Sequence, residues 1–123
     1  MNWCRAGSAF AGLGVALGAM GAHAFSARLG TYGAPIYQTA VNYHLFHSMA
    51  LLFLGLAARN EIVSLATARA VGILFSVGIL LFSGSLYALA LTGERSLGMI
   101  TPFGGVMFLV GWLVLVRKIE VVS

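Results

Sequence analysis

Charged side chains are rare in this sequence, and their spacing constrains the possible fold more than any other feature. Uncharged runs of 22, 30, 24 and 21 residues separate Arg5 from Arg28, Arg28 from Arg59, Arg69 from Glu94, and Arg95 from Arg117. A helix needs about 20 mostly apolar residues to cross a bilayer. Because lipid offers no partners for backbone N–H and C=O groups, each run has to be helical. The spacing predicts four transmembrane spans, over residues 6–26, 36–58, 70–92 and 97–116.

Composition excludes most soluble classes of protein. Only 8% of the residues are charged, whereas about 25% is usual for a soluble domain. We therefore expect residues 1–123 to form one integral membrane domain in the lipid bilayer. Few groups remain for acid–base chemistry, so we expect no enzyme and no catalytic residues. The basic residues stand singly between apolar runs and form no stripe for nucleic acid. The single cysteine, Cys4, excludes an internal disulfide and a cysteine-based metal motif.

Short connections between the spans predict an antiparallel, up-down-up-down four-helix bundle. The first connection is predicted over Ser26–Pro35, with Pro35 in the first turn of the second helix. With four spans, five Lys/Arg residues lie on the side of both termini and two on the other side. The positive-inside rule then places both termini in the cytoplasm. We expect a bacterial inner membrane rather than a mitochondrial one, because no Arg- and Ser-rich transit segment precedes the first span.

Residues 1–24 also imitate a signal peptide, with Ala22-His23-Ala24 at the position of a cleavage site. Their glycine-rich run is long for such a peptide, and the small residues recur with a helix-packing period. We therefore expect this segment to remain as the first span.

Small residues predict the packing faces. Gly7, Ala11, Gly14, Gly18 and Ala22 share one face of the first helix, and Gly14-xxx-Gly18 permits close approach of a second helix. A second stripe in the third helix contains Gly72, Ser76, Ser83 and Tyr87. In the fourth helix, Pro102 predicts a kink next to Gly104 and Gly105. These features favour packing within the bundle or against a second copy; the alternative is a hinge or a ligand cleft.

Polar residues gather in the outer half of the second span: Tyr37, Gln38, Asn42, Tyr43, His44 and His47. An arc of roughly 140° holds Tyr37, Tyr43, His44, His47 and Ser48, whereas Gln38 and Asn42 lie one turn apart on another face. At about 1.5 Å per residue from each outer helix end, His23 and His44 differ in depth by roughly one turn. The spacing predicts that the three histidines converge.

Four chemistries are compatible with such a cluster. It can be a set of interhelical hydrogen bonds, a pair of axial ligands for a b-type haem, a quinone site, or an imidazole metal site. Glu61, Glu94 and Glu120 all lie outside the spans, so no carboxylate reaches this depth. That pattern disfavours a proton-coupled transporter and hydrolytic chemistry.

Several longer motifs resemble one family of small membrane proteins, the domain of unknown function 423. They are Gly18–Ala24, Gln38–His47, Phe82–Tyr87, Thr101–Gly105 and Gly111-Trp112, in this order. The resemblance runs from the first helix to the fourth and implies a four-helix inner-membrane protein of about this length. It places His23, Gln38, Tyr43, His47, Ser83, Tyr87 and Pro102 at motif positions. It implies no activity.

Two functions of different class follow as hypotheses. The first is a non-catalytic accessory or assembly subunit, acting through its small-residue faces in a homo-oligomer or a larger membrane complex. The second is a redox-associated module that binds haem or quinone near His23, His44, His47 and Tyr43.

Overall fold

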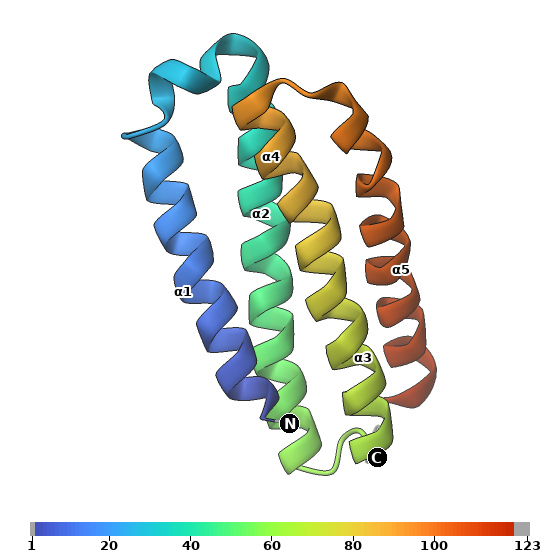
Figure 1. Cartoon of the computed structure of the whole chain (residues 1–123). Helices are drawn as coiled ribbons and strands as arrows, with labels where there is room; N and C mark the ends of the chain where they lie inside the picture. Colours follow the sequence, from blue (N-terminus) through green and yellow to red (C-terminus); the bar gives the residue numbers. More distant parts are fainter. Residues whose placement is uncertain (1, 120–123) are drawn as a thin grey trace.

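The computed structural model describes residues 2–119, which are helical except at the turns (Figure 1). The helices are α1 (Trp3–Ala22), α2 (Ser26–Arg59), α3 (Leu65–Gly78), the π-helix η1 (Ile79–Ser83), α4 (Gly84–Thr92), the 3₁₀-helix η2 (Arg95–Met99) and α5 (Thr101–Lys118). Because α3, η1 and α4 follow one another without a break, they form one long rod. With α1, α2 and the pair η2–α5, this makes four rods. Figure 1 shows them side by side, with successive connections at opposite ends.

The prediction of an all-helical protein is confirmed. Three helical segments are long and apolar enough to cross a membrane: Ser26–Arg59, Leu65–Thr92 and Arg95–Lys118. They correspond to the second, third and fourth predicted spans. The first predicted span corresponds to α1, which has 20 residues. Five of these are glycines, whose hydropathy is close to zero, and α1 is not among the three long apolar segments.

The predicted connection over Ser26–Pro35 is wrong in its bounds, because this segment is helical and the rod of α2 already begins after Gly30. α2 begins at Ser26 and changes direction at Gly30, where φ is 58° and ψ is −160°. Glycine reaches such a positive φ without the steric penalty of a Cβ atom. The segment before Gly30 lies across the end of the bundle (Figure 1). Pro35 therefore lies inside α2, five residues after the break, and not in its first turn.

The predicted kink at Pro102 is also wrong. The fourth rod changes from 3₁₀ to α geometry before this residue, and Pro102 occupies the first turn of α5. The missing proline N–H costs little there, because first-turn N–H groups have no helical partner. Gly93, with φ of 73°, ends α4 in the left-handed conformation typical of a helix C-terminus.

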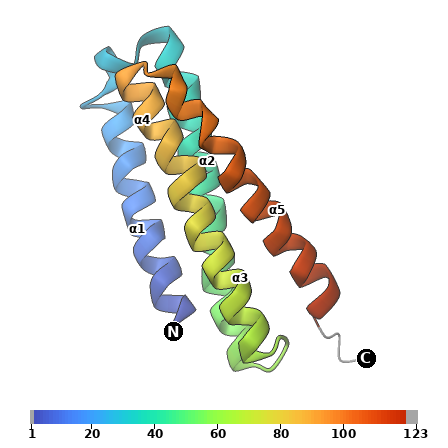
Figure 2. The same cartoon turned by 45° about the vertical axis from the view of Figure 1, so that its right-hand side comes forward.

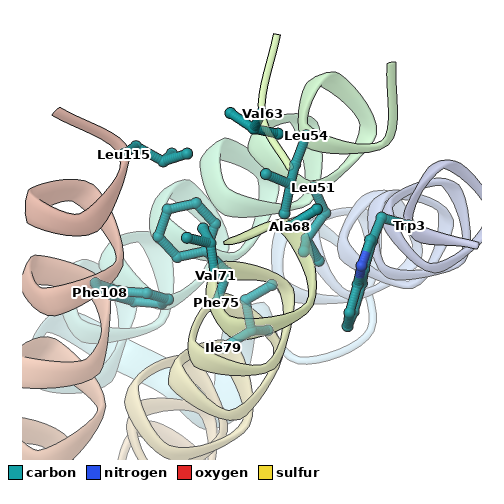
Figure 3. Packing of buried hydrophobic residues seen from close by; sticks show 10 residues of the cluster. All are labelled: Trp3, Leu51, Leu54, Val63, Ala68, Val71, Phe75, Ile79, Phe108 and Leu115. Atoms are coloured by element: carbon teal, nitrogen blue, oxygen red, sulfur yellow. The ribbon is translucent and has the colours of Figure 1, made fainter. Parts of the chain in front are cut away.

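The main core lies at the end of the bundle where the chain starts. Figure 3 shows its buried side chains. They come from α1, α2, the 60–64 turn, α3, η1 and α5, and Phe75 is fully buried among them. α5 packs on α3 and η1, and toward its C-terminal end it runs outward from the other rods (Figure 2). One side of α2, with Asn42, Phe46, Met49 and Phe53, stays exposed.

Candidate functional site

The alignment of α1 with α2 positions the polar residues of the interior. The Tyr37 hydroxyl donates to the backbone carbonyl of Leu17, and His44 contacts that of Phe10. A Cβ atom on Gly7 would lie 2.7 Å from the backbone oxygen of Ser48. In each pair the two residue numbers add up to 54 or 55, as expected for antiparallel helices. α1 and α2 thus contact each other along most of α1.

His44 joins three helices and is 2% exposed. Its Nε2 lies 2.8 Å from the Phe10 carbonyl oxygen in α1, and its Nδ1 lies 2.8 Å from the Tyr87 hydroxyl in α4. Because a carbonyl only accepts, Nε2 carries the hydrogen and Nδ1 of the neutral ring accepts from Tyr87. Gly14 permits this contact, since a Cβ atom there would lie 3.3 Å from the His44 ring.

His47 has the opposite tautomer and lies on another side of α2. Its Nδ1 is 2.9 Å from the backbone oxygen of Tyr43 and therefore donates to it. Its Nε2 accepts from the indole N–H of Trp112 at 3.0 Å. The ring stacks on Phe108 of α5, with centroids 3.6 Å apart and planes at 9°. His47 thus links α2 to α5.

The predicted convergence of the three histidines is wrong. His23 is exposed at the end of α1. His44 contacts Phe10 and Gly14 of α1, so His23 lies nine to thirteen residues, or about 14–20 Å along the helix, from the level of His44. The cause lies at both helix ends: after the break at Gly30, the rod of α2 begins about five residues before the predicted span, and α1 ends at Ala22, four residues before its predicted end. Between residues 2 and 119, no group of three His, Cys, Asp or Glu side chains could hold a metal.

The donor atoms do not fit a haem iron or another metal. Axial ligation needs a free imidazole nitrogen. Both nitrogens of His44 and both nitrogens of His47 already take part in hydrogen bonds. A metal bound to either ring would have to replace one of these hydrogen bonds, three of which join different helices.

Two further hydrogen bonds connect helices through backbone carbonyls. The fully buried Ser83 hydroxyl donates to the carbonyl of Ala40 at 2.8 Å. Ser83 closes η1, whose wider turn changes the register between α3 and α4. Arg28 donates from Nε to the carbonyl of Leu91 at 2.9 Å. Neither hydrogen bond was predicted from the sequence. No sequence signal marks η1, and the position of Arg28 between two spans is typical of a simple flanking charge.

Gln38 and Asn42 remain outside this interior network. Their side chains are exposed on α2, and Gln38 Nε2 donates to Asn42 Oδ1 at 2.8 Å. Asn42 and the 46% exposed Tyr43 border an open groove of about 680 Å³ between α2, η1 and α5, here called the α2–α5 groove. Its other lining residues include Phe46, His47, Phe82, Pro102, Gly105, Val106, Phe108, Leu109 and Trp112.

The small-residue faces are used inside the molecule. A Cβ atom on Gly14 would lie 2.7 Å from Leu45, and one on Gly18 would lie 3.4 Å from Val41, both in α2. Gly72 lies against the Trp3 ring, and Gly104 lies against the Phe82 backbone. Gly105 makes only ordinary contacts. Of the interpretations open to the sequence, packing within the bundle describes these glycines.

Comparison with known proteins finds a family model described as "Protein of unknown function (DUF423)", which matches residues 17–105. A "UPF0382 membrane protein" of Staphylococcus epidermidis is 44% identical over 85% of this chain and 83% of its own length. The "UPF0382 inner membrane protein YgdD" of Escherichia coli is 43% identical over 86% of this chain and 80% of its own length. YwdK of Bacillus subtilis, a "UPF0382 membrane protein", is 38% identical over 85% and 84%. No solved structure matches the chain.

Proposed function

Since this chain belongs to the DUF423 family, whose relatives are named membrane proteins, we propose that it is a non-catalytic accessory or assembly subunit of a bacterial inner-membrane complex. In this proposal all four rods span the bilayer, and both termini are cytoplasmic. The surface that meets the partner is the uncovered side of α2, and not the small-residue faces.

The length of α1 and the charge distribution support four spans. At 1.5 Å per residue, the 20 residues of α1 extend about 30 Å, the thickness of the hydrocarbon core. α1 also packs on α2 along most of its length. The end of the bundle that holds Arg5, Arg59, Arg69, Arg117 and Lys118 faces the cytoplasm under the positive-inside rule.

The interior hydrogen bonds support a structural role for the buried polar residues. His44, Tyr37 and Ser83 each bond to a backbone carbonyl of another helix. Interhelical bonds of this kind stabilise membrane bundles by about 0.6 kcal/mol each. These three polar groups are thereby engaged in holding the helices together.

The observation that carries the proposal is the exposed Gln38–Asn42 pair. Polar side chains within a span usually face protein or a water-filled cavity, because lipid cannot hydrogen-bond with them. Asn42 is followed on the same exposed side of α2 by Phe46, Met49 and Phe53. Steps of four, three and four residues are the spacing of a helix–helix seam. We infer that a transmembrane helix of a partner subunit covers this side and bonds to the two amides.

Native mass spectrometry after gentle extraction tests this proposal. The wild-type protein is expected to carry additional protein subunits, and the double variant Gln38→Leu/Asn42→Leu is expected to lose them. Ser8→Leu is a matched control, because Ser8 is exposed on α1 and its hydroxyl bonds within its own helix to Cys4. A wild-type monomer without partners contradicts the proposal. So does an unchanged set of subunits in the double variant.

A quinone in the α2–α5 groove is a second candidate function. Aromatic rings line this groove, and the Tyr43 hydroxyl and the Asn42 amide nitrogen have no hydrogen-bond partner within residues 2–119. Both groups can donate to a quinone carbonyl. Tyr43→Phe is then expected to lose an extractable quinone while its circular dichroism stays that of the wild type. A quinone-free wild-type protein, extracted from its own membrane, rules this candidate out.

A further inference from the structure

A second cavity lies at the opposite end of the bundle from the Gln38–Asn42 pair. It has a volume of about 780 Å³ and opens where α1 begins, α2 ends and α3 begins. Arg59 from the last turn of α2 and Arg69 from α3 both line it. We call it the arginine pocket; its other lining residues are Asn2, Trp3, Cys4, Gly55, Ala58, Leu65, Ala68 and Ile73.

The pocket has positive charge without a matching acid. No carboxylate is among its lining residues, and no ion pair with Arg59 or Arg69 is present in the described part of the chain. α1 and α3 begin at the pocket and α2 ends there, so the partial positive charges of two helix N-termini outweigh the partial negative charge of one C-terminus. Two guanidinium groups at one cavity repel each other unless an anion lies between them, and guanidinium binds phosphate with paired hydrogen bonds.

The remaining wall of the pocket is apolar. Leu65 and Ile73 are exposed there on one side of α3, and Trp3 and Ala68 form buried surface behind them. Arg59 ends one apolar helix and Arg69 lies in the first turns of the next, so the pocket is at the edge of the membrane core. In a bilayer, the two arginines of the pocket would therefore meet lipid headgroups, and its apolar side chains would meet the acyl chains.

We propose that the arginine pocket binds an anionic phospholipid. The phosphate lies between Arg59 and Arg69, and the first part of an acyl chain runs along Leu65 and Ile73. This inference goes beyond the proposed function, because it needs only that these helices lie in a bilayer and it concerns a different face of the molecule.

Competition between lipids of equal chain length tests the proposal. The detergent-purified protein is mixed with phosphatidylglycerol or phosphatidylcholine, and bound lipid is counted by native mass spectrometry. At about 1 kcal/mol for each basic side chain, the double variant Arg59→Gln/Arg69→Gln is expected to lose a roughly 30-fold preference for phosphatidylglycerol. The control is Arg117→Gln/Lys118→Gln, which removes the same charge from the same end of the molecule but not from the pocket.

Three results overturn the proposal. A wild-type protein without preference for phosphatidylglycerol shows that the pocket selects no anionic lipid. An equal loss in both double variants shows that diffuse surface charge, and not the pocket, attracts the lipid. Displacement of the lipid by excess inorganic phosphate, with the phosphate remaining bound, assigns the pocket to a free anion.

Tryptophan fluorescence gives a second test that does not depend on the arginine variants. Trp3 lines the pocket, and Trp112→Phe leaves it as the single tryptophan. Phosphatidylglycerol with brominated acyl chains is expected to quench Trp3 more strongly than brominated phosphatidylcholine at the same mole fraction. Equal quenching by the two lipids contradicts the proposal.

Discussion

At the scale of single residues, backbone carbonyls decide the chemistry of the two buried histidines. Phe10 and Tyr43 offer carbonyl oxygens, which only accept, and they face Nε2 of His44 and Nδ1 of His47 respectively. The hydrogen of each ring is thereby fixed on a different atom. The second nitrogen of His47 accepts from Trp112, whose indole only donates.

The two histidines are therefore expected to be neutral and to have opposite tautomers. Solid-state NMR of protein labelled with ¹⁵N-histidine measures this directly in membranes at neutral pH. His44 is expected to carry its hydrogen on Nε2 and His47 on Nδ1. The assignments come from spectra of His44→Gln and His47→Gln, each of which removes one set of signals. The same tautomer at both positions would contradict the hydrogen bonds described above.

Replacing Tyr87 with phenylalanine removes one bond between α4 and α2. Tyr87→Phe keeps the ring but leaves His44 Nδ1 without its partner, so the free energy of unfolding should fall by about 0.6 kcal/mol and at most about 1.7 kcal/mol. Unfolding by SDS in mixed micelles measures the change. Tyr32→Phe serves as the control, because Tyr32 is 49% exposed and its ring, which lies under Arg95, is retained. Equal stability of the two variants would mean that the His44–Tyr87 bond contributes nothing.

At the scale of helices, missing side chains bring α1 close to α2. A Cβ atom on Gly7 would lie 2.6 Å from the backbone nitrogen of Leu52, closer than atoms can approach. Gly12 lies on the opposite, exposed side of the same helix, with nothing within 4 Å of its Cβ position. The same residue type thus has different roles on the two faces of one helix.

Alanine at these two positions is expected to change stability in opposite directions. Gly7→Ala must push α1 away from α2 or strain their backbones, and overpacking of this kind typically costs about 1–3 kcal/mol. Gly12→Ala gains up to about 1 kcal/mol from the higher helix propensity of alanine. SDS unfolding of both variants in the same micelles compares them. If Gly7→Ala is as stable as Gly12→Ala, the close approach of α1 and α2 is wrong.

The beginning of α3 depends on a side-chain cap. The Ser64 hydroxyl accepts a hydrogen bond from the backbone N–H of Thr67 at 3.1 Å. Ser64→Ala should therefore destabilise the protein by about 1 kcal/mol. Ser8→Ala is the matched control. The Ser8 hydroxyl donates to the Cys4 carbonyl within α1 and caps no backbone N–H group. Loss of protection of the Thr67 amide in hydrogen exchange locates the effect, and unchanged exchange there would contradict the capping role.

At the scale of the whole molecule, the arrangement of the rods determines which surfaces stay uncovered. α5 packs on α3 and η1, and toward its C-terminal end it runs outward from the other rods (Figure 2). The uncovered side of α2 holds Asn42 and the α2–α5 groove. The arginine pocket lies at the other end, where three helices meet. The two proposed binding surfaces are therefore physically separate and can be tested independently.

The proposed orientation predicts where single cysteines can be labelled. In a Cys4→Ser background, Glu94→Cys lies in the turn between α4 and η2, and Ile62→Cys lies in the turn between α2 and α3. A membrane-impermeant maleimide is expected to label position 94 in bacterial cells whose inner membrane is intact. Position 62 is expected to react only after that membrane is permeabilised. Labelling of both positions in intact cells would contradict the single span between them, and labelling of position 62 alone would contradict the positive-inside assignment.

The sequence by itself determined the class of the protein and the composition of its helices. Charges cannot lie in hydrocarbon at low cost, so the positions of Arg28, Arg59, Arg69 and Arg95 already divide the chain into apolar helices. Local periodicity also separated Gln38 and Asn42 from the arc of His44 and His47, because residues of one helix keep their relative directions. The sequence could not place helix ends, since Ser26–Pro35 and Thr101–Pro102 contain turn-forming residues that the structure accommodates within helices.

Only the tertiary structure decided which polar residues meet. The depth of a side chain depends on where its helix begins and how far neighbouring helices slide past each other. The break at Gly30 starts the rod of α2 about five residues before the predicted span, and α1 ends at Ala22, four residues before its predicted end; together these shifts removed His23 from His44. The π-turn of η1 set the register of Ser83 and Tyr87, although no residue there signals it. The hydrogen-bond partners of the histidines are backbone carbonyls, which every residue possesses and which no sequence pattern can reveal. Sequence periodicity fixes directions within one helix, whereas contacts between helices depend on the packing of the whole bundle.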